Sequence, residues 1–183
     1  MNPSEDTRNL IDKFKGMPNE AIVAELDKTR VPLEVAIENL AHDFNIGTIV
    51  RNANAFNVAK VHIIGKRKYN RRGAMVTDKY LHIDHFATVD EFVSDAHARG
   101  MKIVAVDNNR PEAKALQQTA LLPNSILVFG SESDGISQEL LDQADQAFYI
   151  EQLGSTRSIN VGCASAVALY EAVRQLGLIS KDA

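Results

Sequence analysis

The sequence predicts an α/β fold, with a mostly parallel sheet and helices on both of its faces. Two observations favour this class. Short apolar runs alternate with helix-prone segments through most of the 183-residue chain, which is typical of repeated strand–helix units. Several runs are continuously apolar, as in strands that are buried on both faces of a parallel sheet. A hydrophobic content of 45% is sufficient for one core of this kind.

The predicted strands are short apolar segments, each followed by polar residues or glycine. They occupy residues 33–37, 60–64, 102–106, 126–129 and 147–150, with a further candidate at 83–89. Because helical segments separate most of them, we expect consecutive strands to run parallel.

The predicted helices lie between these strands, at residues 45–56, 88–100, 138–144 and 164–176. Thr88 and Glu91 have the spacing of a capping box, and Gly100 ends the same helix. Ser137 is the expected N-cap of the third helix. The fourth helix carries an apolar stripe formed by Val167, Tyr170, Val173 and Leu176.

The chain divides at Pro32 into an expected N-terminal helical extension, residues 1–31, and one α/β domain, residues 32–183. The extension is polar, and residues 19–26 are its best amphipathic stretch. Its acidic start does not form a signal peptide. We expect no membrane partner, because no apolar run reaches the length of a bilayer crossing. The single cysteine, Cys163, excludes an internal disulfide and indicates a cytoplasmic protein.

The charge of the chain is slightly acidic, with a formal net charge of -4 and a sequence pI near 5.7. Proteins that bind nucleic acid through their overall charge are usually basic, so any phosphate-binding surface must be local. The segment 66–72 is the candidate, since five of its seven residues are basic. Such a run is often only a solvated loop. Its position after a predicted strand and before Gly73 favours a loop that contacts phosphates.

Three segments far apart in the chain place small polar residues at the end of an apolar run. They are residues 45–53, 129–137 and 150–161. The carboxyl ends of strands are where α/β proteins bind ligands. We therefore expect the three segments to meet at one site.

The second segment does not have the composition of a phosphate-binding loop. Gly130 and Gly135 have the spacing that starts a P-loop, but Ile136 stands where the phosphate-binding lysine is required. Acidic residues also occupy the loop. A nucleoside triphosphate is therefore disfavoured, and a ligand with positive charge fits better.

Metal and thiol chemistry are also disfavoured. His82 and His85 are a close histidine pair, but a spacing of three turns their rings to opposite faces of a strand. A complete zinc site needs three or four ligands, so we expect no metal. We expect Cys163 to be a buried structural cysteine.

Taken together, the three segments resemble the motifs of the SpoU/TrmH family of SPOUT methyltransferases, over about residues 33–176. The matching motifs are Asn45-x-Gly47-x-x-x-Arg51-Asn52-Ala53-x-Ala55-Phe56, Val128-Phe129-Gly130-Ser131-Glu132-x-x-Gly135-Ile136 and Ser158-Ile159-Asn160-Val161. The chain departs from the usual family pattern at Glu151-Gln152, where Pro-Met is common, at Gly162, where Ser is common, and at Asn57, where Gly is usual.

The resemblance implies methyl transfer from S-adenosyl-L-methionine to a ribose 2′-hydroxyl of RNA. It also implies a C-terminal trefoil knot, an exception to the near-absence of knots, and a homodimer. We expect tRNA as the substrate, because residues 1–31 are too short for the separate RNA-binding domain of many relatives that act on rRNA. An rRNA substrate and a non-catalytic RNA-binding protein with the same fold stay open as alternatives.

The same resemblance implies roles for individual residues. Arg51 is expected to activate or orient the ribose hydroxyl, and Asn45 to position Arg51 or the RNA. Glu132 is expected to hold the motifs together, and Ser158 and Asn160 to supply hydrogen bonds near cofactor and substrate. The expected cofactor-binding residues are Gly130, Ile150, Ser158 and Ile159, and the expected RNA-binding residues are Lys66, Arg67, Lys68, Arg71 and Arg72.

Overall fold

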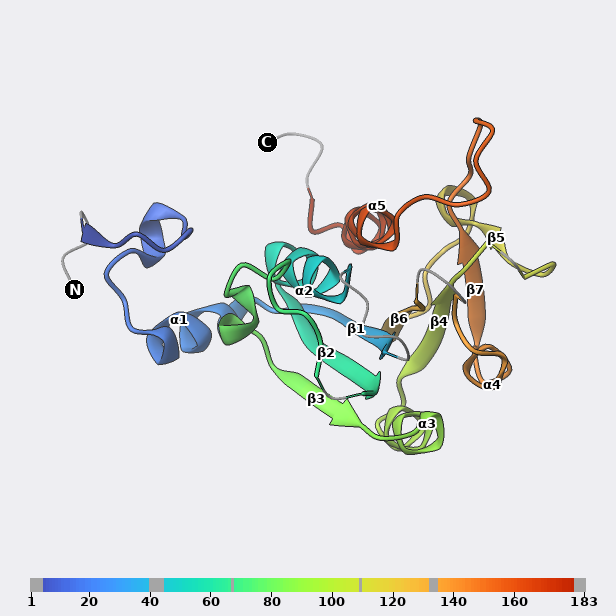
Figure 1. Cartoon of the computed structure of the whole chain (residues 1–183), viewed down its shortest axis with the longest axis horizontal. Helices are drawn as coiled ribbons and strands as arrows, with labels where there is room; N and C mark the ends of the chain where they lie inside the picture. The colour runs from blue at the N-terminus through green and yellow to red at the C-terminus, as the bar shows by residue number, and fades with distance from the viewer. Residues whose placement is uncertain (1–4, 40–44, 67, 109, 132–134, 180–183) are drawn as a thin grey trace.

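The computed structural model describes residues 5–39, 45–66, 68–108, 110–131 and 135–179. Within these ranges, parallel strands form one seven-stranded sheet in the order β3-β2-β1-β6-β4-β7-β5 (Figure 1). The strands are β1 (Val31–Asn39), β2 (Val58–Gly65), β3 (Ile83–Phe86), β4 (Lys102–Val106), β5 (Lys114–Ala115), β6 (Ser125–Phe129) and β7 (Gln146–Tyr149).

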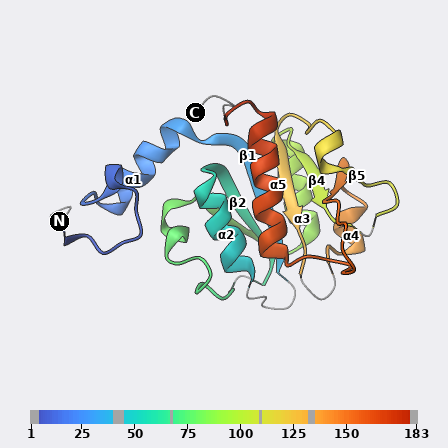
Figure 2. The ribbon, with the colours of Figure 1, turned by 90° about the horizontal axis from the view of Figure 1, so that it is seen from above.

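The α-helices are α1 (Asn19–Leu26), α2 (Asn45–Ala55), α3 (Val89–Ala98), α4 (Gln138–Leu141) and α5 (Val161–Gln175). All of them except α1 cover a face of the sheet. Helices α2 and α5 lie on one face, and α3 and α4 lie on the other (Figures 1 and 2).

Strand β6 contributes side chains to two hydrophobic clusters, one on each face of the sheet. Leu127 and Phe129 join the hydrophobic cluster that contains residues of α2 and α5. Ile126 and Val128 join the cluster of α3 and α4. Successive side chains of a strand point to opposite faces, so a continuously apolar strand is buried on both sides. The predicted α/β class with a parallel sheet is confirmed, and the trefoil knot stays a prediction.

Several predicted boundaries were wrong by a few residues. Strand β3 ends at Phe86 rather than at residue 89, because Thr88 is already the N-cap of α3 and accepts from the backbone N–H of Glu91. Helix α4 ends at Leu141, three residues early. The short edge strand β5 was not predicted, since two residues carry no detectable period.

Helix α5 differs from its prediction in its start and in its surface. It begins at Val161 rather than at residue 164, because the Asn160 side chain caps it by accepting from the N–H of Cys163 at 3.2 Å. The prediction of a buried Cys163 is wrong: this residue is exposed on the first turn. The side of α5 that packs on the sheet and α2 is formed instead by small and aliphatic residues, namely Ala168, Leu169, Ala172 and Val173.

The N-terminal segment packs through a separate small core. Phe14 and Ile22 are buried against Tyr80, which lies in the short 3-10 helix Thr77–Tyr80. Figure 1 shows α1 projecting to one side of the sheet. In the part of the chain that the structure describes, no helix combines the length and the apolar composition of a membrane span.

Candidate functional site

The first and third polar segments meet where α2 and α5 begin. The Asn160 side-chain amide donates a hydrogen bond of 2.9 Å to the side-chain oxygen of Asn45. The two helices approach closely here: a Cβ atom added to Gly162 would lie 2.8 Å from the Thr48 methyl carbon. A side chain at position 162 would therefore have to displace the Thr48 side chain, and glycine leaves room for it.

A second contact between the same helices is made by Asn52. Its side-chain amide donates to the carbonyl oxygen of Gly162 at 2.8 Å and to the hydroxyl of buried Ser165 at 2.9 Å. An asparagine in the middle of a helix is unfavourable for the isolated helix. Here it satisfies polar groups between two packed helices, so it holds the first motif against the third.

Arg51 is exposed on α2 and lies beside the basic segment. Gly47 is four residues before Arg51, and the two therefore share a face of the helix. Gly47 packs on the loop that follows β2, since an added Cβ would lie 2.7 Å from the Asn70 carbonyl oxygen. Arg51 itself is exposed to solvent.

The described residues of the second polar segment that flank positions 132–134 are bonded to each other after β6. Ser131 and Gly135 exchange two backbone hydrogen bonds of 3.0 Å. A Cβ atom added to Gly130 would collide with the backbone carbonyl of Gly135. Only glycine at position 130 therefore allows the backbone of Gly135 to approach so closely. Glu132, which was predicted as a site residue, lies outside the described residues.

Glu38 supports this loop from β1. The residue is 2% exposed, and its carboxylate accepts a hydrogen bond of 2.7 Å from the backbone N–H of Ser137. Ser137 in turn caps α4 by accepting from the N–H of Leu140. The buried carboxylate therefore fixes the far end of the glycine-rich loop. Sequence reasoning missed Glu38, because it falls inside an apolar strand.

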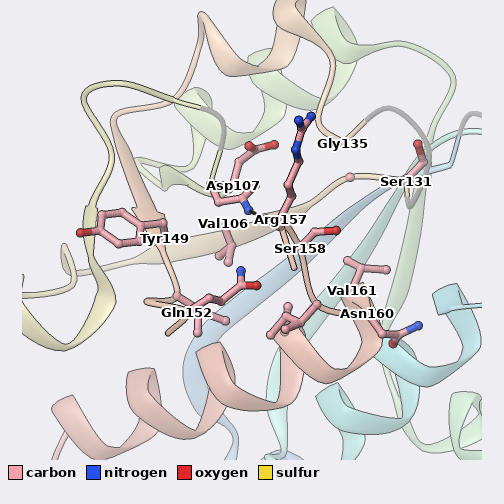
Figure 3. Close-up of a pocket in the computed structure, with 15 residues that line it drawn as sticks. Val106, Asp107, Ser131, Gly135, Tyr149, Gln152, Arg157, Ser158, Asn160 and Val161 are labelled. Carbon is pink, nitrogen blue, oxygen red and sulfur yellow. Dashed lines mark hydrogen bonds between the residues drawn. The ribbon is translucent and has the colours of Figure 1, made fainter. Parts of the chain in front are cut away.

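A cavity of about 580 Å³ lies at the carboxyl ends of β6, β4 and β7, against the start of α5 (Figure 3). It is lined by Val106, Asp107, Asn108, Gly130, Ser131, Gly135, Tyr149, Ile150, Gln152, Arg157, Ser158, Ile159, Asn160, Val161 and Ala164. All four predicted cofactor-binding residues are in this set, and so is Asn160. The structure thus brings the second and third segments to one cavity, and the bond from Asn160 to Asn45 joins the first segment to its rim.

Some residues of the cavity wall were missed by sequence reasoning. Asp107 and Asn108 follow β4 directly, so the rule that polar residues at strand ends mark a site would have found them. The Asn108 side chain donates to the carbonyl oxygen of Arg157 at 2.6 Å and holds the third segment over β4. Gln152 belongs to the third segment, which was expected to reach the site, whereas no local signal identifies Tyr149, which strand order places here.

The basic segment forms an exposed loop next to α2. Lys66, Lys68, Arg71 and Arg72 are exposed, whereas Arg67 lies outside the described residues. The Arg71 guanidinium pairs with Asp78. Tyr69 packs partly against the core, and its burial raises the pKa of its phenol.

The two histidines each have a hydrogen-bond partner. The Nε2 atom of His82 lies 2.8 Å from a carboxylate oxygen of Asp27, and that of His85 lies 2.7 Å from the carbonyl oxygen of Gly65. In the described part of the chain, no group of three or more His, Cys, Asp or Glu residues has an arrangement that could hold a metal ion.

Comparison with known proteins agrees with this arrangement. The family model described as "SpoU rRNA Methylase family" matches residues 32–170. The chain is 33% identical over 161 residues to the tRNA (guanosine(18)-2'-O)-methyltransferase of Escherichia coli K12, covering 85% of this chain and 69% of that protein. It is 26% identical to a 23S rRNA (guanosine-2'-O-)-methyltransferase of Acinetobacter baylyi, over 92% of this chain and 77% of the relative.

Among solved structures, a TrmH/SpoU tRNA modifying enzyme of A. aeolicus superimposes with a TM-score of 0.75 at 27% identity. The match covers 87% of this chain and 83% of that one. The resemblance inferred from the three motifs is confirmed. On the strength of the match over residues 32–170 and of a relative that is 33% identical, this chain belongs to the SpoU rRNA Methylase family.

Proposed function

We propose that this protein is an S-adenosylmethionine-dependent RNA 2′-O-ribose methyltransferase that acts on tRNA. The observation that carries the proposal is the single cavity that collects Gly130, Ile150, Ser158 and Ile159 and that is joined through Asn160 to α2. The E. coli relative, whose name states a 2′-O-methylation of tRNA, supports both the reaction and the substrate.

The cavity fits the cofactor in size and in chemistry. Small-molecule sites commonly enclose about 300–1,000 Å³, and this one encloses about 580 Å³. Ile150, Ile159 and Val161 provide apolar surface for a base, whereas Asp107 provides a carboxylate for a cation. Gly130 has no side chain, and a Cβ atom at this position would collide with the backbone of Gly135. When bound, S-adenosylmethionine supplies the electrophilic methyl group on its sulfonium.

Arg51 is assigned to the ribose hydroxyl. A ribose hydroxyl is a poor nucleophile unless its proton leaves as the carbon is attacked. A guanidinium has a pKa above about 12 and is therefore a very weak base. Arg51 is better suited to orient the 2′-oxygen and to stabilise the negative charge that develops there, with the neighbouring RNA phosphate as a candidate acceptor for the proton.

The remaining motif residues position these groups. The bond from Asn160 holds the Asn45 side chain at the start of α2. Ser158 lines the cavity with a hydroxyl that can donate or accept a hydrogen bond. Glu132 is assigned to hold the second motif against its neighbours. Holding the hydroxyl in line with the transferred methyl supplies much of the acceleration.

RNA is proposed to bind across the basic loop and α2. The net charge of -4 requires a local binding surface. The described basic side chains are exposed, and their loop packs on Gly47 at the start of the helix that carries Arg51. Lysine and arginine contacts to phosphates would hold the RNA in register without reading its sequence. The set assigned to this role is Lys66, Arg67, Lys68, Arg71 and Arg72.

A homodimer is proposed, built on the outer face of α5. Val167, Tyr170 and Leu176 of the apolar stripe are 45%, 50% and 37% exposed. A second copy related by a twofold axis would cover this stripe with the same residues.

We further assign residues 1–31 to a helical extension and residues 32–183 to the catalytic domain, and we place the protein in the cytoplasm.

Methyl incorporation tests the proposal. The protein is incubated with labelled S-adenosylmethionine and, separately, with unmodified tRNA and rRNA pools. Label in tRNA at one phosphodiester that resists alkaline cleavage is the expected result, because a 2′-O-methyl group blocks attack on the phosphate. A preparation made in the same way from cells that lack the protein is the control for contaminating activity.

The second candidate substrate is rRNA, favoured by the Acinetobacter relative. Label confined to the rRNA pool would replace tRNA with rRNA and leave the reaction unchanged. Binding of S-adenosylmethionine without incorporation into either pool would instead indicate a non-catalytic RNA-binding protein.

A further inference from the structure

Two consecutive residues after the basic loop, Met75 and Val76, have a backbone conformation that L-amino acids rarely adopt. Their φ angles are 48° and 69°, in the left-handed region, where a β-branched residue such as valine is an outlier. Neither residue is glycine, so the backbone is strained at both positions. Strain of this kind persists only where the surrounding structure enforces it, and it clusters at sites that bind ligands.

The residues on either side of this pair enforce the strain. Ala74 is 0% exposed and packs on α2, since a Cβ atom added to Gly47 would lie 2.8 Å from its backbone nitrogen. Thr77 is also buried, and its backbone N–H and its hydroxyl both donate to the Ala74 carbonyl oxygen, at 2.9 and 2.6 Å. Both neighbours are therefore fixed, whereas the Met75 and Val76 side chains between them are 56% and 54% exposed. The strained turn thus presents two apolar side chains to solvent.

The other exposed residues of this segment are all cations. Of the residues described between positions 66 and 80, those exposed besides Met75 and Val76 are Lys66, Lys68, Arg71, Arg72 and Lys79. The one carboxylate of this stretch, Asp78, is buried and paired with Arg71. An anionic ligand that also has an apolar surface matches such a patch. An RNA with an unpaired base has both features, because its phosphates are anionic and the face of the base can stack on side chains.

The pair lies close to the helix that carries Arg51. A Cβ atom added to Gly73 would lie 2.8 Å from the backbone nitrogen of Thr48, in the first turn of α2. Figures 1 and 2 show the segment between β2 and β3 running alongside this helix. Thr48 precedes Arg51 by three residues, which is about 4.5 Å along the helix axis. A base held at Met75 therefore belongs to a nucleotide close to the one whose ribose reaches Arg51.

We propose that Met75 and Val76 form an apolar platform on which the RNA substrate places an unpaired base near the methylated nucleotide. This inference rests on the proposed function, because it assumes that RNA binds across the basic loop. Methionine is flexible and polarizable, so it suits a binding surface that must adapt to its ligand, and apolar side chains that include methionine also unstack bases in DNA. The cations hold the phosphates, whereas the platform requires the RNA to be single-stranded. The surface therefore selects loops over duplexes.

Fluorescence anisotropy with two labelled hairpin RNAs tests for contact with a base. The hairpins share one stem, and the loop carries adenosines in the first and abasic nucleotides in the second, so both present the same phosphates. Every base has a face that can stack, so the probe does not require a natural sequence. The unsubstituted protein is expected to bind the adenosine loop at least about fivefold more tightly, which is the lower end of what a stacked base contributes.

Met75→Asn and Val76→Asn remove apolar surface without changing the charge. In each variant, the preference for the adenosine loop is expected to fall toward unity. The slope of log affinity against log salt should stay that of the unsubstituted protein, because no cation is lost. Asparagine adopts the left-handed region more readily than valine or methionine, so the thermal unfolding midpoint is expected to rise by about 2–4 °C. Greater stability with weaker base binding is the result expected of strain that serves a ligand.

Ile11→Asn is the control, since Ile11 is an apolar residue of the N-terminal segment that is 66% exposed. This variant should keep the preference for the adenosine loop. A preference that survives in both Met75→Asn and Val76→Asn, or a lower unfolding midpoint that accompanies its loss, overturns the platform. A changed solution mass of these variants with an unchanged preference would assign the pair to an interface between copies of the chain, and it would overturn the platform too.

The outcomes separate this inference from the proposed function. A base preference that depends on Met75 and Val76, without methyl incorporation into RNA, supports the inference and contradicts catalysis. Methyl incorporation without such a preference supports catalysis and overturns the inference. A protein that binds neither hairpin overturns the inference, and methyl incorporation then decides the proposed function by itself.

Discussion

The side chains of Asn45 and Asn160 are joined by a hydrogen bond of 2.9 Å, although 115 positions separate the two residues. Asn160 also caps α5, and Asn45 is the first residue of α2. One contact therefore connects the starts of two helices. It also links the cavity, which Asn160 lines, to the helix that carries Arg51.

Breaking this contact is expected to slow methyl transfer while leaving the fold intact. In Asn45→Ala, the single-turnover rate constant is expected to fall by about 10- to 100-fold, because small displacements of positioning groups have effects of this size. Asn160→Ala also removes the cap, which costs about 1 kcal/mol of stability. In a double-mutant cycle, the two effects on rate should be less than additive. Full additivity would show that the contact has no part in positioning.

Arg51→Ala is expected to reduce turnover far more than cofactor affinity. Removing one group that stabilises a developing oxyanion typically costs about 10²–10³ in rate. The dissociation constant of S-adenosylhomocysteine, measured by calorimetry, should stay within about twofold, since Arg51 is not among the residues that line the cavity. Arg51→Lys keeps the charge but loses the planar donor pair, so it should recover only part of the rate. Full activity of Arg51→Ala would remove this residue from the chemistry.

Neutralising the basic loop is expected to weaken RNA binding and its dependence on salt. Arg71→Gln with Arg72→Gln removes two exposed charges. The slope of log affinity against log salt should become shallower by about 1.4 to 1.8, at about 0.7 to 0.9 for each phosphate that the loop no longer neutralises. Lys13→Gln with Lys28→Gln, on the N-terminal segment, is the matched control of equal charge. An equal change in slope for the two double variants would mean that the overall charge of the protein, and not the basic loop, determines RNA binding.

Stability is expected to fall in acid through Glu34. Burial by itself raises the pKa of this carboxyl, but hydrogen bonds from His62 and Arg99 outweigh it and lower the pKa to about 2 from a usual 4.5. The stabilisation is therefore complete above pH 4.5 and is lost as the pH falls toward 2. At about 1.4 kcal/mol per pKa unit, this stabilisation amounts to about 3–4 kcal/mol.

Urea unfolding between pH 7 and pH 3 measures this effect. Arg99 donates to both carboxylate oxygens of Glu34, at 2.8 and 2.9 Å, and His62 lies 2.6 Å from one of them. Glu34→Gln should be less stable at pH 7 and should lose less of its stability on acidification. Glu20→Gln, on the exposed surface of α1, serves as the control. If the pH profile of Glu34→Gln matches that of the unsubstituted protein, another carboxyl is responsible.

The dimer proposal predicts a change in mass when α5 is altered. Tyr170→Glu places a charge in the exposed apolar stripe, so the solution mass measured by light scattering should fall from that of two chains to that of one. Ile11→Glu alters a residue of similar exposure on the N-terminal segment and should leave the mass unchanged. A single-chain mass for the unsubstituted protein would contradict the proposal.

Local sequence patterns were sufficient to predict most helices and strands and to identify the three motifs. The apolar run of β4 predicted its limits, and Thr88 and Ser137 identified two helix starts, because strand burial and capping depend on near neighbours. Local patterns did not predict that Asn160 caps α5, which therefore begins at Val161, three residues before its predicted start. A side chain that caps one helix while bonding to another is not visible in a local pattern.

What the sequence by itself determined is the α/β class, the order of the motifs and, through them, the family. Only the tertiary structure decided that Asn45 lies against Asn160, that Cys163 is exposed and that Tyr149 completes the cavity wall. The physical reason is the order of the strands. Placing β4 between β6 and β7 depends on packing across the whole sheet, whereas hydrophobic period and turn chemistry act over a few residues.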